Sequence, residues 1–116
     1  MRGEDTVRTE YTNGQLYLAK ILEEIGFIVD MEVPVFPYKA DILLRKEWVV
    51  IEYDGAHSFK KRDKKRDEYL IEHYKLPTLR ITQLSPKQEL IKKIADWIST
   101  WEESAKERRE WAFENS

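Results

Sequence analysis

The sequence predicts a single α/β domain, in which a mixed four-stranded sheet is flanked by helices. Helix-type and strand-type patterns follow one another in the order helix, three strands, helix, strand, helix. A helix-length segment separates the third and fourth predicted strands, which favours a parallel pair joined by a right-handed crossover. The 116 residues fit one domain and leave little room for a second. We therefore treat residues 1–116 as one domain.

The first helix is predicted over residues 12–27. Its apolar residues form one stripe, a Thr-Asn pair suits the N-cap, and Gly26 suits the C-terminal stop. The next segment, Phe27–Val35, is rich in residues that favour strands. Prolines at and just after its end indicate an edge strand.

Two further strands are predicted at Lys39–Arg45 and Trp48–Asp54, around a short Lys-Glu connection. Residues 58–74 have helical spacing, and a proline follows them. The segment LPTLRIT, residues 76–82, then reads as the fourth strand. These elements form a core over about residues 12–82.

A long C-terminal helix is predicted over about residues 86–113. Its apolar stripe consists of Leu90, Ile91, Ile94, Trp97, Ile98 and Trp101. Beyond Trp101 the stripe thins, so the last turns either project, fray or meet another subunit, or the same residues close the core. A homodimer through this helix is one expectation.

Composition limits the function classes. The chain has no Cys, which excludes a disulfide framework and a thiolate metal site and agrees with a reducing compartment. It has no apolar run of membrane-spanning length and no signal-peptide pattern, so we expect a soluble, cytoplasmic protein with no membrane contact. The net charge of −2 gives no overall attraction to nucleic acid, so any such binding must come from local clusters.

Two acidic residues of the predicted hairpin are expected to face each other. If Lys46 and Glu47 are the central residues of the turn, the antiparallel register places Asp41 opposite Glu52. Such neighbours have Cβ atoms about 5 Å apart. Strand alternation places Asp54 on the same face. A four-residue loop would keep this register, whereas a three-residue loop would shift it.

Facing carboxylates in a partly covered sheet repel each other unless a proton or a cation intervenes. Mg²⁺ suits Asp41 and Glu52 better than Zn²⁺, which would want more His or Cys ligands; Mn²⁺ is expected to substitute. The alternative is that these carboxylates, and Asp54 beside them, simply face water at the strand ends.

His57 follows the strand end and Gly55, where a side chain can lean over the carboxylates. It could act as a general acid or base or bind a phosphate, although a lone His is more often a surface or packing residue. Asp63 and Asp67 lie four residues apart on the following helix. They are either ion-pair partners or groups that orient His57 or a metal-bound water.

The segment HSFKKRDKKRDE, residues 57–68, concentrates positive charge on that helix. Its basic residues are Lys60, Lys61, Arg62, Lys64, Lys65 and Arg66. One interpretation is a solvated helix face with i,i+4 ion pairs. The other is a surface that attracts the phosphate backbone of a nucleic acid beside the carboxylates.

Four segments together resemble a known family. They are VPVFPYKADILL, VVIEYDGAHSF, RDEYL and LPTLRIT. The chain is similar over about residues 12–82 to the very short patch repair endonuclease-like branch of the PD-(D/E)XK, or restriction-endonuclease-like, superfamily. The matching positions are Asp41, Glu52, Asp54, Gly55, His57, Arg66, Asp67 and the Leu79-Arg80-Ile81 strand.

This resemblance implies a restriction-endonuclease-like αβββαβ core and a Mg²⁺-dependent nuclease that hydrolyses phosphodiester bonds in DNA. It implies that Asp41 and Glu52 bind the metal. It also implies that His57 transfers a proton or contacts phosphate, and that Asp54 and Asp67 support the site.

The chain departs from the superfamily pattern at two positions. Asp54 stands where Lys is usual, so His57 would take over the Lys role. Gln15 stands where related domains often carry a Glu facing the site, and either Glu10 or Glu23 could substitute. These departures leave two rival functions open: an inactive nuclease-fold module that binds nucleic acid or a protein, and a metal-dependent hydrolase of RNA or small phosphoesters.

Overall fold

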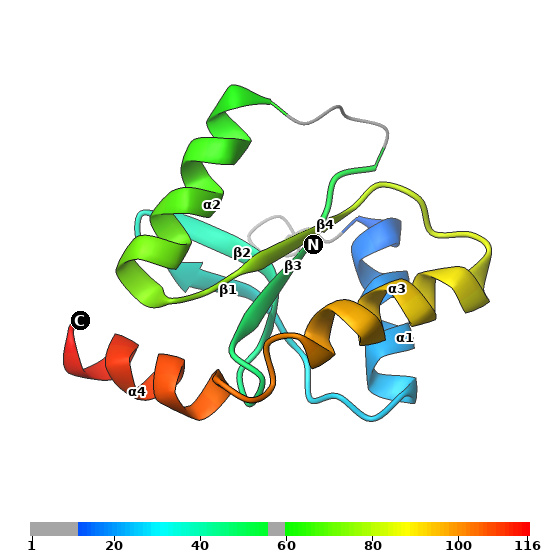
Figure 1. The fold of residues 1–116 in the computed structure, drawn as a ribbon. Coiled ribbons are helices and arrows are strands. Elements are labelled where there is room, and N and C mark those ends of the chain that lie inside the picture. Colours follow the sequence, from blue (N-terminus) through cyan, green and yellow to red (C-terminus); the bar gives the residue numbers. More distant parts are fainter. Residues whose placement is uncertain (1–11, 56–59) are drawn as a thin grey trace, which may run out of the picture.

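A computed structural model describes residues 12–55 and 60–116 of the chain. The elements are α1 (Asn13–Glu24), β1 (Asp30–Val35), β2 (Tyr38–Leu44), β3 (Val49–Tyr53), α2 (Lys61–Tyr74), β4 (Thr78–Ile81), α3 (Lys87–Ser99) and α4 (Ala105–Glu114). The strands form one sheet in the order β1-β2-β3-β4 (Figure 1). The first two pairs are antiparallel, and β3 and β4 are parallel. The predicted mixed four-stranded α/β sheet is confirmed.

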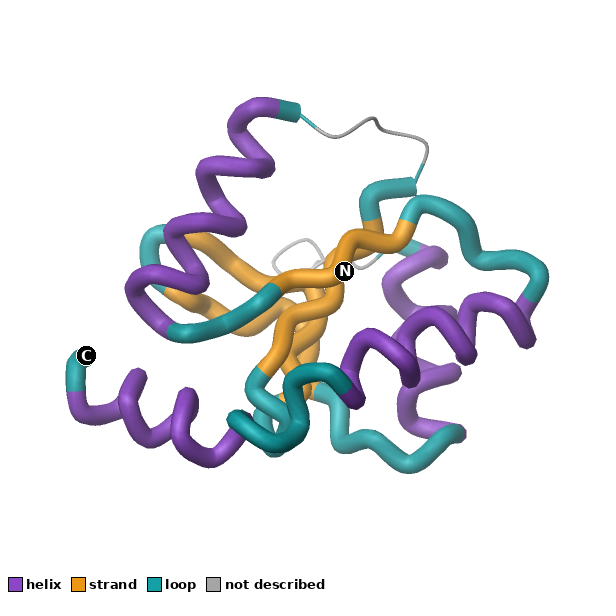
Figure 2. The backbone as a smooth tube through the Cα atoms, viewed as in Figure 1, coloured by secondary structure: helices purple, strands orange, loops and turns teal. Residues whose placement is uncertain are grey.

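Helices cover both faces of the sheet. In Figure 2, α1 and α3 lie on one side of the strands, and α2 and α4 lie on the other. Two buried clusters match these layers: one joins the sheet to α1 and α3, and the second joins it to α2 and α4. Along β3, Val49 and Ile51 belong to the first cluster and Val50 to the second. The continuous apolar run in this strand therefore reflects burial on both faces.

The sheet is irregular where β1 pairs with β2. Met31 and Val33 are two residues apart in β1, a spacing that normally keeps side chains on one face. They nevertheless pack against opposite clusters, and Glu32 between them has a φ of 53°. The neighbours of Asp41 in β2 are divided between the two clusters in the same way. Both strands therefore change face beside the predicted carboxylate site.

The prediction of a single C-terminal helix over about residues 86–113 is wrong. The segment forms two helices, α3 and α4, separated by residues 100–104. α3 covers one face of the sheet and α4 reaches the other, where Ala112 is 3% exposed. One straight helix could not cover both faces. The guanidinium of Arg108 donates to the carbonyl of Trp101, which helps to hold the break.

The expected homodimer through this segment stays a prediction. α4 turns Ala105 and Ala112 into the chain's own core, whereas Phe113 is 62% exposed. Within the described ranges, no helix combines the length and the apolar character needed to cross a membrane.

Candidate functional site

The register that brings Asp41 opposite Glu52 is confirmed. The hairpin pairs Leu44 with Val49 around a four-residue turn, and the same register continues toward the other end of the strands. At that end, side-chain carboxylates accept the backbone N–H groups of the neighbouring strand. The backbone N–H of Asp41 donates to Glu52 Oε2 at 2.8 Å. The N–H of Tyr53 donates to Asp41 Oδ2 at 3.0 Å. Each acidic side chain therefore reaches across to the neighbouring strand.

Burial and the neighbouring charge perturb Asp41. Glu52 is 6% exposed. Burial, followed by the charge of Glu52, raises the pKa of Asp41 to about 7, although the hydrogen bond from Tyr53 opposes the rise. The charge of Glu32 raises the pKa further. Near neutral pH the two carboxylates are therefore held close together with less than two full negative charges.

Arg66 lies against Glu52 rather than on the outer face of α2. Its Nη2 is 2.9 Å from Glu52 Oε2 and also donates to the carbonyl of Lys39 at 2.9 Å. The guanidinium lies 5.6 Å from the ring centroid of Tyr38. Only 13% of the Arg66 side chain is exposed. The structure thus places this predicted phosphate-binding residue inside the carboxylate site.

Arg80 joins three of the predicted acidic residues. It contacts both oxygens of Asp54, at 3.0 and 3.2 Å, and both oxygens of Asp67, at 2.9 and 2.7 Å. Asp63 is more distant, at 3.8 Å. Burial lowers the pKa of Arg80, but Asp67 and then Asp54 raise it above its usual value overall. Asp54 and Asp67 are therefore ion-pair partners, and their contact with Arg80 ties the end of β3 to α2 and β4.

Gln15 connects α1 to an acidic residue that the sequence interpretation missed. Gln15 is 5% exposed, and its Oε1 accepts the N–H of Thr12. Its Nε2 donates to Glu32 Oε2 at 2.9 Å. The other oxygen of Glu32 is 3.1 Å from Lys39 Nζ. In the β1–β2 register, the residues on either side of Glu32 pair with those on either side of Asp41. The sequence could have indicated Glu32 if the predicted strand pairing had been extended from β2 to β1.

Glu23 is the remaining acidic residue of the prediction that the structure describes. His57 and Glu10 are outside the described residues. Glu23 is exposed in the last turn of α1, about 12 Å along the helix from Gln15. It therefore does not replace the missing helix carboxylate beside Asp41.

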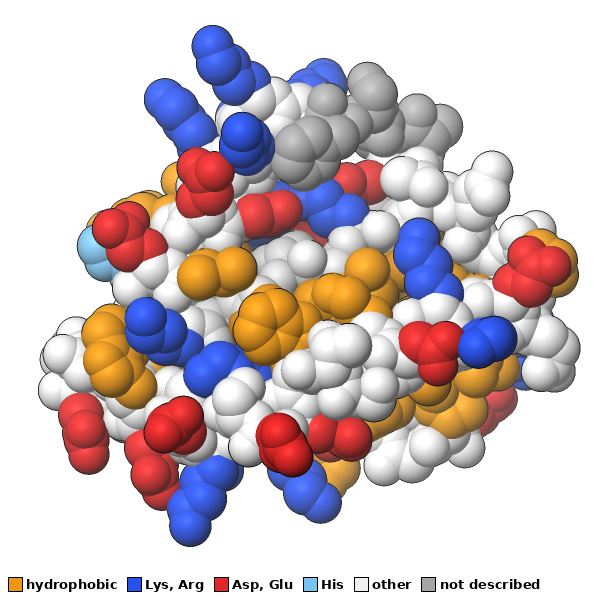
Figure 3. Space-filling model, viewed as in Figure 1, with side chains coloured by type: hydrophobic (Ala, Val, Ile, Leu, Met, Phe, Trp, Pro, Cys, Tyr) orange, Lys and Arg blue, Asp and Glu red, His pale blue; other side chains and the backbone are white. Residues whose placement is uncertain are grey.

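The other basic residues of the run are exposed at the start of α2. They are Lys60, Lys61, Arg62, Lys64 and Lys65. Figure 3 shows basic side chains projecting from this end of the molecule. The inward side of the same helix carries Arg66 and Asp67. α2 therefore separates an outer basic face from an inner face that holds the site.

The carboxylate oxygens of Asp41 and Glu52 are ligands of the type that a hard cation prefers. Among the described residues, no three His, Asp or Glu side chains are grouped to hold a metal ion. Asp41 and Glu52 each use one oxygen to accept a backbone N–H, and each has a second oxygen. Mg²⁺ is commonly bound by one or two carboxylates, with water and substrate phosphates completing the shell. The pair fits such an ion, because a cation would offset both the burial of Asp41 and the charge of Glu52, which raise the pKa of Asp41.

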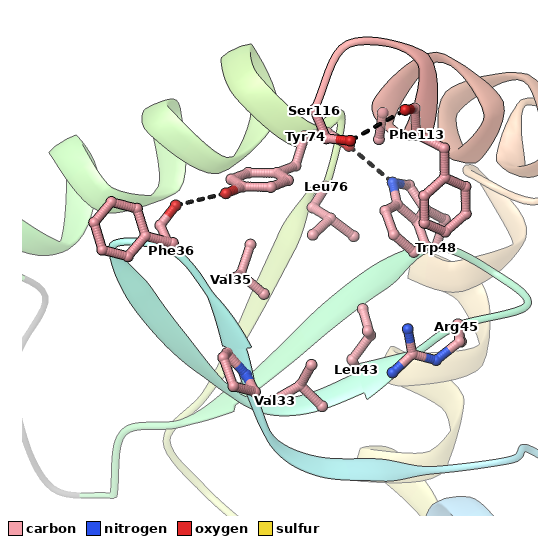
Figure 4. Close-up of a pocket in the computed structure, with 12 residues that line it drawn as sticks. Val33, Val35, Phe36, Leu43, Arg45, Trp48, Tyr74, Leu76, Phe113 and Ser116 are labelled. Atoms are coloured by element: carbon pink, nitrogen blue, oxygen red, sulfur yellow. Dashed lines mark hydrogen bonds between the residues drawn. The ribbon is translucent and has the colours of Figure 1, made fainter.

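A separate cavity of about 220 Å³ lies away from the carboxylates, where β1 approaches α4 and the end of α2 (Figure 4). Its lining is mainly apolar and includes Val35, Leu43, Trp48 and Leu76. Arg45 lies at its edge and is paired with Asp30. The lining therefore offers few groups for phosphate or metal chemistry.

Comparison of the chain with protein-family models, with curated proteins and with solved structures finds no match.

Proposed function

We propose that this protein is a metal-dependent endonuclease that hydrolyses phosphodiester bonds in DNA. The observation that carries the proposal is the pairing of Asp41 with Glu52 across two strands, beside a helix with an exposed basic face. A related proposal is that the core is restriction-endonuclease-like and related to the very short patch repair branch. The order of elements supports it: a helix, three strands, a helix and a strand.

The two carboxylates would hold Mg²⁺, and Mn²⁺ would substitute. When bound, the ion would polarise the phosphate and lower the pKa of a bound water. Asp41 and Glu52 are positioned for this role by each other's strands, through the hydrogen bonds from the backbone N–H groups of Asp41 and Tyr53. His57 is proposed to transfer a proton or to contact the phosphate.

Asp54 and Asp67 have a supporting role in this proposal. Both are engaged by Arg80, so neither is free to act as a base or as a metal ligand in this arrangement. Arg80 instead fixes the end of β3, two residues beyond Glu52, against α2. The Asp at the position where the superfamily usually has Lys would therefore be a structural residue.

The exposed lysines of α2 would bind the phosphate backbone. Each phosphate contact releases counterions, so binding should weaken steeply with salt. Replacing Lys61, Lys64 and Lys65 by Gln should weaken DNA binding and reduce the salt dependence, without altering the carboxylate pair.

The test is cleavage of labelled single-stranded, duplex, branched and mismatched DNA with Mg²⁺ or Mn²⁺, followed by EDTA. Cleavage that requires the metal, is stopped by EDTA and is lost in Glu52→Gln supports the proposal. Glu23→Gln is the matched control, because Glu23 is exposed on α1. A Glu52→Gln protein that cuts at the wild-type rate would remove the metal-ligand assignment.

A second candidate is a nuclease-fold module that binds nucleic acid or a protein without cutting. Two contacts favour it: Arg66 already neutralises Glu52, and Gln15 supplies an amide where a carboxylate is usual. The same assay, joined to a measurement of Mn²⁺ binding, decides between the two, because this module would neither cut any of the DNA substrates nor bind Mn²⁺. Adding labelled RNA and a small phosphodiester to the assay tests the third possibility, a hydrolase of those substrates.

A further inference from the structure

Arg66 is the one basic residue of the run on α2 that turns inward among the described residues. Its guanidinium donates to Glu52 Oε2 and to the carbonyl of Lys39, and it lies near the ring of Tyr38. These contacts all come from β2 and β3, whereas the side chain itself belongs to α2. The position is therefore built by several elements, unlike the extended side chains on the outer face of α2.

The charge of Arg66 meets the carboxylate that the proposed metal would also use. Glu52 is 6% exposed, and the side chain of Arg66 is 13% exposed, so solvent screens this pair only weakly. Glu52 Oε2 is engaged by Arg66 and by the backbone of Asp41. A divalent cation at the carboxylate pair would therefore share Glu52 with a positive charge that is already present.

We propose that Arg66 is a built-in counter-cation of Glu52, which holds the orientation of this carboxylate and lowers the affinity of the site for a divalent cation. The inference rests on the proposed function, because it concerns the same site. Two like charges that share one partly buried carboxylate repel each other. Removing the charge of Arg66 therefore strengthens binding of a divalent cation, whereas damage to the fold would weaken it.

The test measures Mn²⁺ affinity by the electron paramagnetic resonance signal of the free ion, with no DNA present. Arg66→Gln keeps hydrogen-bond donors and loses the charge, so we expect it to bind Mn²⁺ about threefold to tenfold more tightly than the wild type. Arg66→Lys keeps a positive charge beside Glu52, so it should bind Mn²⁺ less tightly than Arg66→Gln does. Arg62→Gln removes the same type of residue from the exposed face of α2, and its Mn²⁺ affinity should not change.

Arg66→Met provides a second uncharged variant. Circular dichroism checks that both Arg66→Met and Arg66→Gln are folded. Equal or weaker Mn²⁺ binding by the folded, uncharged variants would overturn the inference. If the wild type binds Mn²⁺ and cuts DNA but Arg66→Gln binds no more tightly, only this inference fails. If the wild type neither binds Mn²⁺ nor cuts DNA, the proposed function fails and this inference fails with it.

Discussion

The two ends of the sheet both use half-buried arginine side chains, but against different partners. At the carboxylate end, Arg66 and Arg80 meet charged side chains. At the hairpin-turn end, Arg108 of α4 meets uncharged backbone. Its guanidinium donates to the carbonyls of Glu47, Trp48, Lys75 and Trp101.

The pKa shifts separate the two kinds of arginine. Burial and then the nearby charge of Arg109 lower the pKa of Arg108, and no carboxylate in the described part of the chain pairs with it to offset the loss of water. The pKa of Arg80 moves in the opposite direction, because Asp67 and Asp54 outweigh burial. The turn end is thus held by hydrogen bonds to the backbone, whereas the carboxylate end is held by pairs of opposite charge. The proposed chemistry belongs to the second end, and the first is expected to be structural.

The largest effect on stability is expected at Arg80. In Arg80→Met, the carboxylates of Asp54 and Asp67 remain half-buried without their arginine. Breaking such a pair on one side should lower the free energy of unfolding by about 3 kcal/mol. Urea denaturation measures the change, with the exposed Arg62→Met as control. A loss equal to that of the control would show that the cluster does not hold β3, β4 and α2 together.

Arg108→Met should cost less, about 2 kcal/mol, because it leaves neutral carbonyls rather than charges without partners. The same variant also tests whether the turn end affects cleavage. DNA cleavage per folded molecule should stay within about twofold of the wild type, because Arg108 is remote from Asp41 and Glu52. Cleavage is measured at a temperature where urea denaturation shows both proteins folded. A large loss of cleavage in the folded variant would contradict a purely structural role for the turn end.

The pH dependence of stability should reveal Asp41. Its pKa is raised from 3.8 to about 7 on folding, so the folded state binds a proton more tightly than the unfolded state does. This contribution to stability is full below about pH 4 and is lost as the pH rises to about 7. Without added metal, Asp41→Asn should lose this pH dependence and be more stable than the wild type at pH 8. Thermal unfolding between pH 4 and 8 checks this, and parallel profiles for the two proteins would contradict it.

The smallest effect is expected at Glu32, which has a φ of 53°. Glu32→Ala and Glu32→Gly both lose the contacts with Gln15 and Lys39. Only glycine adopts this backbone conformation without steric cost, so Glu32→Gly should be more stable than Glu32→Ala by about 1 kcal/mol. Urea denaturation of the two variants measures the difference. If alanine is as stable as glycine, the backbone at this position is not strained.

The sequence predicts the parts of the fold that depend on repeating patterns. The apolar runs identify β2 and β3, and the four-residue turn keeps the register that pairs Asp41 with Glu52. The order of elements predicts the parallel pairing of β3 with β4. These features follow from local periodicity and chain connectivity.

Other features depend on tertiary contacts and leave little trace in the sequence. Nothing in DMEVPV marks Glu32 for a left-handed backbone. The five basic residues at the start of the polar helix α2 are close together in the sequence, and their spacing does not reveal that Arg66 alone among them turns inward. The break between α3 and α4 contains neither Gly nor Pro, and it depends on α4 covering the second face of the sheet.

The most direct test of the central claim is a crystal structure of the protein grown or soaked with Mn²⁺, with anomalous difference density to locate the ion. We predict one strong peak between Asp41 and Glu52, within about 2.1 Å of one oxygen from each carboxylate. The absence of a peak there at saturating Mn²⁺, or a peak bound only by other residues, would contradict the claim that these two side chains share a cation.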